Sequence, residues 1–145
     1  MKRTTPVLLF FIFLLLPVLV RSQDKQGAKK IDLISAENMI YDKSKGDYTL
    51  LIGNVIFQHE EVLLYCDSAY LYDAANSLDA FGNIHIKASD SMNIYGDSLK
   101  YSGNTKIAEI HKNVRMIDNQ ITLTTEHLTY NLKAKTGTYY DGGKI

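Results

Sequence analysis

Two short sequence markers recur along the chain with one shared period of about 30 residues, which is within the range typical of repeat proteins. The first is an asparagine followed by a β-branched residue, and its three copies are evenly spaced. The second is an acidic residue followed two positions later by an apolar one, and its four copies keep the same spacing. Because two independent markers keep one period, residues 37–140 hold about three and a half copies of one unit, which predicts a solenoid, a propeller or a stacked array. The copies are Gly53-Asn54-Val55, Gly82-Asn83-Ile84 and Lys112-Asn113-Val114 for the first marker, and Glu37-Asn38-Met39, Asp67-Ser68-Ala69, Asp97-Ser98-Leu99 and Glu126-His127-Leu128 for the second.

Apolar and polar residues alternate within each unit, and a period of two is typical of β-strands. Ile84 and Ile86, for example, alternate with His85 and Lys87. No stretch after residue 22 keeps a helical period over three turns, and β-branched and aromatic residues are frequent, as strands favour. The sequence therefore predicts an all-β fold. Segments rich in Asp, Asn, Ser and Gly predict turns at residues 42–47, 73–76, 88–91, 102–104 and 118–119.

The alternation slips by one residue at the same place in each unit. Val62 and Leu64 lie in one phase, whereas the apolar residues that follow, Ala69 and Leu71, lie in the other. A slip of one residue turns side chains to the opposite face unless a bulge or a corner restores the phase. A sheet bent at such stacked corners makes an open trough with an apolar inner face. The acidic residues expected at the corners, either turned to solvent or accepting backbone N–H groups, are Asp67, Asp97 and Glu126.

The first 22 residues have the pattern of a cleaved secretory signal peptide. A basic start precedes an apolar run of about 15 residues, and Val20 and Ser22 suit the −3 and −1 positions of a cleavage site. An uncleaved membrane anchor is the alternative, but a spanning helix needs about 20 apolar residues. We therefore predict a signal peptide at residues 1–22, a linker or first strand at residues 23–35 and the repeat domain at residues 36–145.

Charge and cysteine content exclude several classes of protein. After Ser22 the chain carries 13 basic and 16 acidic residues, a net charge of −3, whereas a nucleic-acid-binding domain needs a basic face. Cys66 is the only cysteine, so no disulfide can form within the chain, and stability must come from the sheet and its core. Cys66 aligns with Gly96 and Thr125, and we interpret it as a small corner residue rather than a reactive thiol.

The sequence shows no constellation of catalytic or cofactor-binding residues. The histidines occupy different places in the repeat without the spacing of metal ligands, and we interpret them as solvated or edge residues. A calcium-binding β-roll would need a shorter glycine-aspartate repeat, and no GxxxxGK[ST] phosphate loop is present. We therefore predict a protein that is not an enzyme, with no cofactor and no metal site. The histidines are His59, His85, His111 and His127, and the tyrosines interpreted as cross-strand packing rather than a sugar platform are Tyr65, Tyr70, Tyr72 and Tyr95.

Three motifs carry a resemblance to a known family: Gly53-Asn54-Val55-Ile56-Phe57, Cys66-Asp67-Ser68-Ala69-Tyr70-Leu71 and Ala80-Phe81-Gly82-Asn83-Ile84. They resemble the repeat signatures of the OstA-like family, which includes LptA, and are similar to those of the amino-terminal periplasmic domain of LptD. The likeness covers about residues 37–140. It implies an open, twisted β-jelly roll, a solenoid-like stack of antiparallel strands whose apolar interior holds the acyl chains of lipopolysaccharide.

The resemblance also implies a function and a place in the cell. We expect a non-enzymatic, periplasmic lipid-transfer component that helps to move lipopolysaccharide towards the outer membrane, with association with that membrane as a further expectation. The alternative is a structural or adhesive β-solenoid that binds proteins through its strand edges, because the pattern alone fits a sealed core as well as an open trough. The inner-face residues expected to bind lipid are Val55, Phe57, Val62, Leu64, Leu71, Ile84, Ile86, Met92, Ile94, Leu99, Tyr101, Val114, Met116, Ile121, Leu123, Leu128 and Tyr130.

The expected partners are lipopolysaccharide and homologous β-jelly rolls, including further copies of this chain. Residues 138–145 lie where another unit would be expected to begin, so we expect either a short family member or a piece of a longer protein. In both cases a terminal strand would present a free edge. Such an edge is a template for another strand, and neighbouring β-jelly rolls would join there by strand addition.

Overall fold

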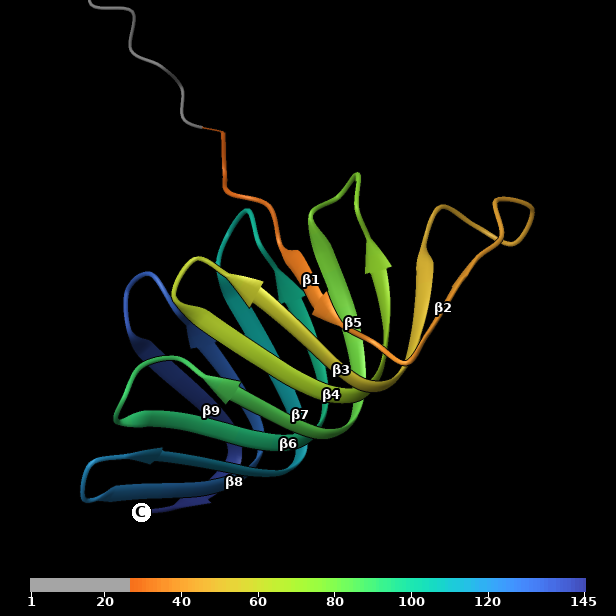
Figure 1. Cartoon of the computed structure of the whole chain (residues 1–145). Helices are drawn as coiled ribbons and strands as arrows, with labels where there is room; N and C mark the ends of the chain where they lie inside the picture. The colour runs from red at the N-terminus through yellow and green to blue at the C-terminus, as the bar shows by residue number, and fades with distance from the viewer. Residues whose placement is uncertain (1–26) are drawn as a thin grey trace, which may run out of the picture.

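The computed structural model describes residues 27–145, so the predicted signal peptide lies outside the described residues. Nine strands form one antiparallel sheet in chain order, except that β1 and β2 both pair with the same side of β3 (Figure 1). Within this range no helix is long and apolar enough to cross a membrane. The strands are β1 (Asp32–Ser35), β2 (Asn38–Tyr41), β3 (Thr49–His59), β4 (Val62–Tyr72), β5 (Ser77–Lys87), β6 (Met92–Ser102), β7 (Ile107–Asp118), β8 (Ile121–Asn131) and β9 (Thr136–Lys144).

The seven long strands, β3 to β9, are joined by hairpin turns, so consecutive strands pair with each other. Each of these strands curves near its middle, and the sheet folds over on itself (Figure 1). The sheet stays open, because β9 at one end and β1 with β2 at the other are paired on one side only. The predictions of an all-β fold and of an open sheet of antiparallel strands are confirmed.

The bend divides the sheet into two lobes. Lobe 1 contains the first halves of β3, β5, β7 and β9 and the second halves of β4, β6 and β8, and lobe 2 contains the opposite halves. The ladder shifts register between the lobes in every long pair, for example between Ile52 and Val55 of β3. In the odd-numbered long strands two consecutive residues there have positive φ, which bends the strand sharply. These pairs are Gly53-Asn54, Gly82-Asn83, Lys112-Asn113 and Asp141-Gly142.

The predicted corner is therefore confirmed, and the Gly-Asn marker forms part of it. The corner carboxylates are exposed as expected, but two of the three accept side-chain amides rather than backbone N–H groups. In the fourth copy Gly142 replaces the asparagine, so Glu126 lacks such a donor. The amide bonds run from Asn54 to Glu37, from Asn83 to Asp67 (2.8 Å) and from Asn113 to Asp97 (2.7 Å).

The inner faces of the two lobes pack against each other in one core. Leu51 and Leu99 come from lobe 1, Phe57 and Ile86 come from lobe 2, and none of them is more than 1% exposed. Burial of one such side chain contributes roughly 1.5–3 kcal/mol to stability. In this structure the two lobes therefore cover the inner face along most of its length. This is the sealed core, one of the two arrangements that the sequence pattern allowed.

Gly82 tests the steric role of the corner. Its φ is 79°, and a Cβ built there would collide with the side chain of Asp67. We expect Gly82→Ala to lower the free energy of unfolding by about 2–4 kcal/mol, because it combines backbone strain with displacement of that carboxylate. Urea denaturation followed by circular dichroism measures the change.

Gly142 is the matched control, since its φ is also 79° but a Cβ there would meet nothing within 4 Å. We expect Gly142→Ala to cost about 1 kcal/mol through backbone strain alone. Gly142→Asn should cost less, because Asn tolerates this conformation and occupies the equivalent position in the other copies. Equal losses for Gly82→Ala and Gly142→Ala would contradict the steric role of Asp67.

Candidate functional site

The tips of the two lobes face each other across a groove with a volume of about 800 Å³. Lobe 2 contributes the turns that follow β3, β5 and β7, and lobe 1 contributes the turns that follow β6 and β8. The volume lies within the roughly 300–1,000 Å³ typical of ligand pockets. Three lysines and three acidic residues also line the groove, so its charges balance. The larger apolar residues that line it are Val62, Met92, Tyr101, Tyr130 and Leu132.

Two contacts between the lobes, which we term the latch, close one end of this groove. His59, the last residue of β3, is 1% exposed, and its Nδ1 lies 2.6 Å from the hydroxyl oxygen of Tyr101 in lobe 1. The adjacent Glu60 forms an ion pair with Lys106. A hydrogen bond from Lys106 to this carboxylate holds the pKa of Glu60 below its usual value. The latch therefore combines a buried hydrogen bond with a partly exposed ion pair.

Residues 28–31, which we term the strap, cross the same end of the groove. The Lys29 carbonyl accepts hydrogen bonds from His59 Nε2 and from Asn76 Nδ2, both at 2.9 Å, and so joins lobe 2 to lobe 1. The Ile31 N–H donates to Asn76 Oδ1 at 2.9 Å. Because a carbonyl can only accept, His59 Nε2 donates to it, and in the neutral ring Nδ1 accepts the hydroxyl proton of Tyr101. Burial raises the pKa of Tyr101, which keeps that hydroxyl protonated.

The interpretation of His59 as a solvated or edge histidine is therefore wrong. The strap and Tyr101 supply a partner for each ring nitrogen, which makes burial of the ring inexpensive. The sequence carried one signal, a departure from the repeat: the positions equivalent to His59 in the next two units are Ala88 and Asp118. Asn76 is a similar departure, because the equivalent turn positions are Lys106 and Lys135. Sequence reasoning treated Asn76 as a turn residue and missed the strap.

The structure places 16 of the 17 predicted inner-face residues in or against the core. Of these, Val62, Met92, Tyr101 and Tyr130 come together along the groove. The buried residues are Val55, Phe57, Leu64, Ile84, Ile86, Ile94, Leu99, Tyr101, Val114, Leu123, Leu128 and Tyr130, and the partly buried ones are Val62, Leu71, Met92 and Met116.

Ile121 is the exception, because it keeps the inward phase of Leu123 but is 57% exposed. Val62 and Met92 hold the equivalent position in the preceding units, and both are partly buried. In lobe 2 the described pairing of β8 with β9 runs as far as Thr124.

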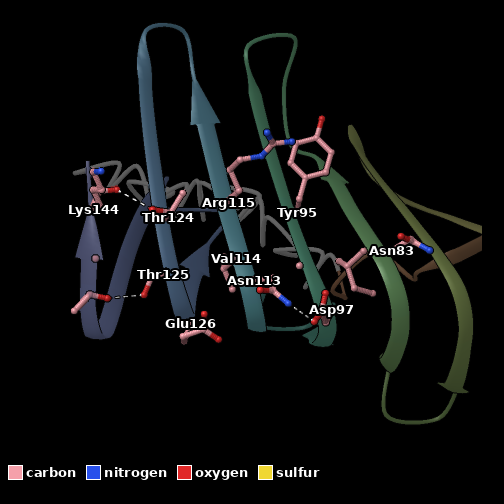
Figure 2. Close-up of a pocket in the computed structure, with 14 residues that line it drawn as sticks. Asn83, Tyr95, Asp97, Asn113, Val114, Arg115, Thr124, Thr125, Glu126 and Lys144 are labelled. Atoms are coloured by element: carbon pink, nitrogen blue, oxygen red, sulfur yellow. Dashed lines mark hydrogen bonds between the residues drawn. The ribbon is translucent and has the colours of Figure 1, made fainter.

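A second depression, of about 880 Å³, crosses the outer face of the sheet near the corner (Figure 2). Tyr95, Arg115 and Thr124 lie side by side on β6, β7 and β8 along one wall. The hydrogen bond from Asn113 to Asp97 lies on the other wall (Figure 2). The depression faces away from the core, so it offers no continuous apolar interior, and we take the groove between the lobes as the candidate site.

Stacked side chains cover the outer face of lobe 2 beside this depression. His85 stacks on Tyr65 and on Tyr95, with ring centroids 5.3 and 4.5 Å apart, and Arg115 lies 4.9 Å from the Tyr95 centroid. The neighbouring side chains thus occupy ring faces on which a sugar would have to stack. Tyr70 and Tyr72 pack edge to face with Tyr48 in lobe 1, so all four tyrosines pack across strands as predicted.

Cys66 lies at the corner on the inner face, in a buried row with Gly96 and Thr125, as predicted. Burial raises the pKa of its thiol to about 12, so the thiol stays protonated and weakly nucleophilic at neutral pH. Among residues 27–145, no three His, Cys, Asp or Glu side chains are grouped so that they could hold a metal ion.

These features define a class of protein: an open antiparallel sheet built from repeats, folded so that its apolar inner faces enclose a core beneath a groove. The chain belongs to the OstA-like protein family, whose sequence model matches residues 28–145. The match spans all nine strands and confirms the resemblance seen in the repeat motifs.

A solved structure with a similar fold is that of LptH from Pseudomonas aeruginosa, described as the LptA homologous periplasmic component of the conserved lipopolysaccharide transport device. The two chains are 14% identical, the alignment covers 80% of this chain and 85% of LptH, and the TM-score is 0.67. At this level of identity the likeness establishes the fold. No curated protein sequence matches the chain.

The buried half of the latch makes a testable contribution to stability. We expect Tyr101→Phe to lower the free energy of unfolding by about 1–3 kcal/mol, because it leaves the buried Nδ1 of His59 without a donor. Tyr130→Phe is the matched control one repeat later, since no hydrogen bond of that hydroxyl is found within residues 27–145. Urea denaturation measures both changes, and a comparable loss for the two variants would show that the latch bond is not stabilising.

Proposed function

We propose that this protein is a non-enzymatic lipid-transfer component of the periplasm, which binds the acyl chains of lipopolysaccharide between its lobes and helps to move them towards the outer membrane. One observation carries the proposal: the apolar inner face runs without interruption from the core to the groove at Val62, Met92 and Tyr130. The proposal is supported by membership of the OstA-like family and by a fold similar to that of LptH, whose description names lipopolysaccharide transport.

The free energy of lipid burial suits this function. Shielding one methylene from water contributes roughly 0.8 kcal/mol, so an acyl chain of about 12 carbons gains on the order of 10 kcal/mol. The lobes must separate to admit it, and each inner-face side chain then exchanges contacts with the other lobe for contacts with lipid. Val55, Ile84 and Val114 hold similar sizes in successive units, so neighbouring binding positions would have similar free energies. Directed movement would then require a drive from elsewhere.

The second candidate function is a structural or adhesive β-solenoid that binds proteins through its strand edges. The packed core between the lobes favours it, because residues such as Phe57 and Ile86 are fully buried by the protein itself. The two candidates differ in one respect that an experiment can resolve: lipid reaches the inner face only in a carrier.

Site-specific photo-crosslinking with purified lipopolysaccharide distinguishes the two functions. A photoreactive residue at Met92 or Met116, which are inward and partly buried, should label the lipid. The same residue at Lys87 or Lys100, which are outward and exposed, should give background labelling. Circular dichroism establishes that each variant folds. Labelling confined to the two lysine positions would rule out lipid binding between the lobes and leave the structural solenoid.

We also propose that further copies of this fold, including this chain itself, join end to end through the sheet edges. Throughout the sheet, strands with two consecutive positive-φ residues at the corner (a left-handed pair) alternate with segments that carry a corner acid. β9 carries the left-handed pair Asp141-Gly142, and the β1–β2 edge carries the acid Glu37. The β9 of one copy beside the β1–β2 edge of the next would therefore continue the repeat in phase. The register of the internal ladders then places Thr138 opposite Ile40 of the next copy.

Engineered cysteines test this register. We expect Thr138→Cys combined with Ile40→Cys to give disulfide-linked oligomers on oxidation, because directly opposite Cβ atoms lie about 4.5–5.5 Å apart. Thr138→Cys combined with Asn38→Cys is the control, two residues out of register, where the Cβ atoms would be about 7–8 Å apart. Non-reducing electrophoresis separates the products. Equal cross-linking of the two pairs would refute the in-phase junction.

A further inference from the structure

The strap, residues 28–31, is held across the end of the groove by side chains and not by a β-ladder. The side chain of Asn76 donates to the Lys29 carbonyl and accepts from the Ile31 N–H, and His59 Nε2 donates to the same carbonyl. The next segment of the chain, β1, is paired with β3 in the sheet. The strap can therefore leave the groove while the strands keep their ladders.

The strap brings one apolar side chain into the core. Residues 27–30 are exposed, and Lys30 donates to the Asp73 carbonyl at the surface, whereas Ile31 is 6% exposed and belongs to the core. The Ile31 N–H bonds to Asn76 in a turn of lobe 1, and β1, which pairs with lobe 2, begins at the next residue, so Ile31 lies between the lobes. Apolar burial is not directional, so an acyl chain in the place of this side chain would gain similar free energy.

The polar groups beneath the strap keep other partners when it leaves. His59 Nδ1 bonds to the Tyr101 hydroxyl at 2.6 Å, and Asn76 Nδ2 also lies 3.0 Å from Asn104 Oδ1. The atoms that would lose the strap are His59 Nε2 and Asn76 Oδ1, which would then face the groove, where water can replace the strap. Release therefore leaves no buried polar group without a partner, and its cost in free energy stays small.

Asn76 serves the strap rather than the turn that contains it. The equivalent residues of the next two units are Lys106 and Lys135, and all three have positive φ, of 50°, 58° and 56°. The turn can therefore be made with lysine. A lysine side chain has no acceptor for the Ile31 N–H and could not hold the strap in the same way. The strap is thus fixed by a departure from the repeat that the fold itself does not need.

We propose that the strap is a displaceable lid: an acyl chain between the lobes takes the place of Ile31, and the strap is then released from Asn76 and His59. The inference rests on the proposed function and identifies a lipid position that the protein covers itself when no lipid is bound. Because the Lys29 carbonyl bonds to both lobes, release of the strap also removes one of the polar links that hold the lobes together.

Two lysines make release of the strap measurable, because a protease cleaves a docked segment only in its open state. Brief digestion with trypsin, followed by mass spectrometry, gives the rates of cleavage after Lys29 and Lys30. We expect purified lipopolysaccharide to raise these rates by about fivefold, and the same lipopolysaccharide stripped of its acyl chains to leave them unchanged. Cleavage after Lys43 and Lys45, in the exposed loop before β3, is the internal control and should not change.

The variant Asn76→Lys tests the hold on the strap, since it installs the residue of the later units and removes both bonds to Asn76. We expect rapid cleavage after Lys30 without lipid and little further increase with it. Lys100→Ala, an exposed lysine of the outer face, is the matched control and should behave as the unmodified protein. Slow cleavage in a folded Asn76→Lys variant would overturn the role of Asn76.

The unmodified protein separates failure of the lid from failure of the proposed function. Lipopolysaccharide that crosslinks at Met92 but leaves cleavage after Lys30 unchanged would overturn the lid and leave the proposed function standing. Absence of crosslinking at Met92 and at Met116 would overturn the proposed function and the lid with it. Crosslinking at Met92 together with faster cleavage after Lys30 is the result expected of a displaceable lid.

Discussion

The structure depends on one repeated constraint, the break in the β-ladder at the middle of every long strand. Each odd-numbered long strand has two consecutive residues with positive φ there, and in three of the four units an asparagine bonds to the corner acid that precedes it in the chain. An unbroken strand of the same length would present its apolar side chains on one flat face with nothing to cover them. The corner turns that face upon itself, so that a single sheet supplies both walls of its own core.

Departures from the repeat then decide how the two ends of the molecule differ. The later units have other residues at the positions equivalent to His59 and Asn76. These two side chains together bind the strap and join the lobes. At the other end Gly142 stands in place of an asparagine, and Glu126 keeps no amide partner. The repeat therefore makes the fold, while a few substitutions within it add the polar bonds that join the lobes at the β3 end.

The same apolar surface serves as core and, on the proposed function, as the binding surface for lipid. These roles are compatible because hydrophobic burial is not directional: a methyl group gains similar free energy against the opposite lobe or against an acyl chain. A lipid that replaces contacts between the lobes therefore substitutes one set of apolar contacts for another. The net free energy of lipid binding then depends on the polar bonds between the lobes that must break. Such bonds are found at the β3 end, where His59 bonds to Tyr101 and Glu60 pairs with Lys106.

Local patterns in the sequence were sufficient to predict the strands, the corners and the inward phase of 16 of the 17 inner-face positions, because alternation and its slip depend on neighbouring residues. They could not predict which inward residues are covered. The bond from Tyr101 to His59 spans 42 residues and that from Ile31 to Asn76 spans 45, so both exist only once distant turns meet. The sequence determined the face of each side chain, and the tertiary structure determined what lies opposite it, since cover comes from the other lobe.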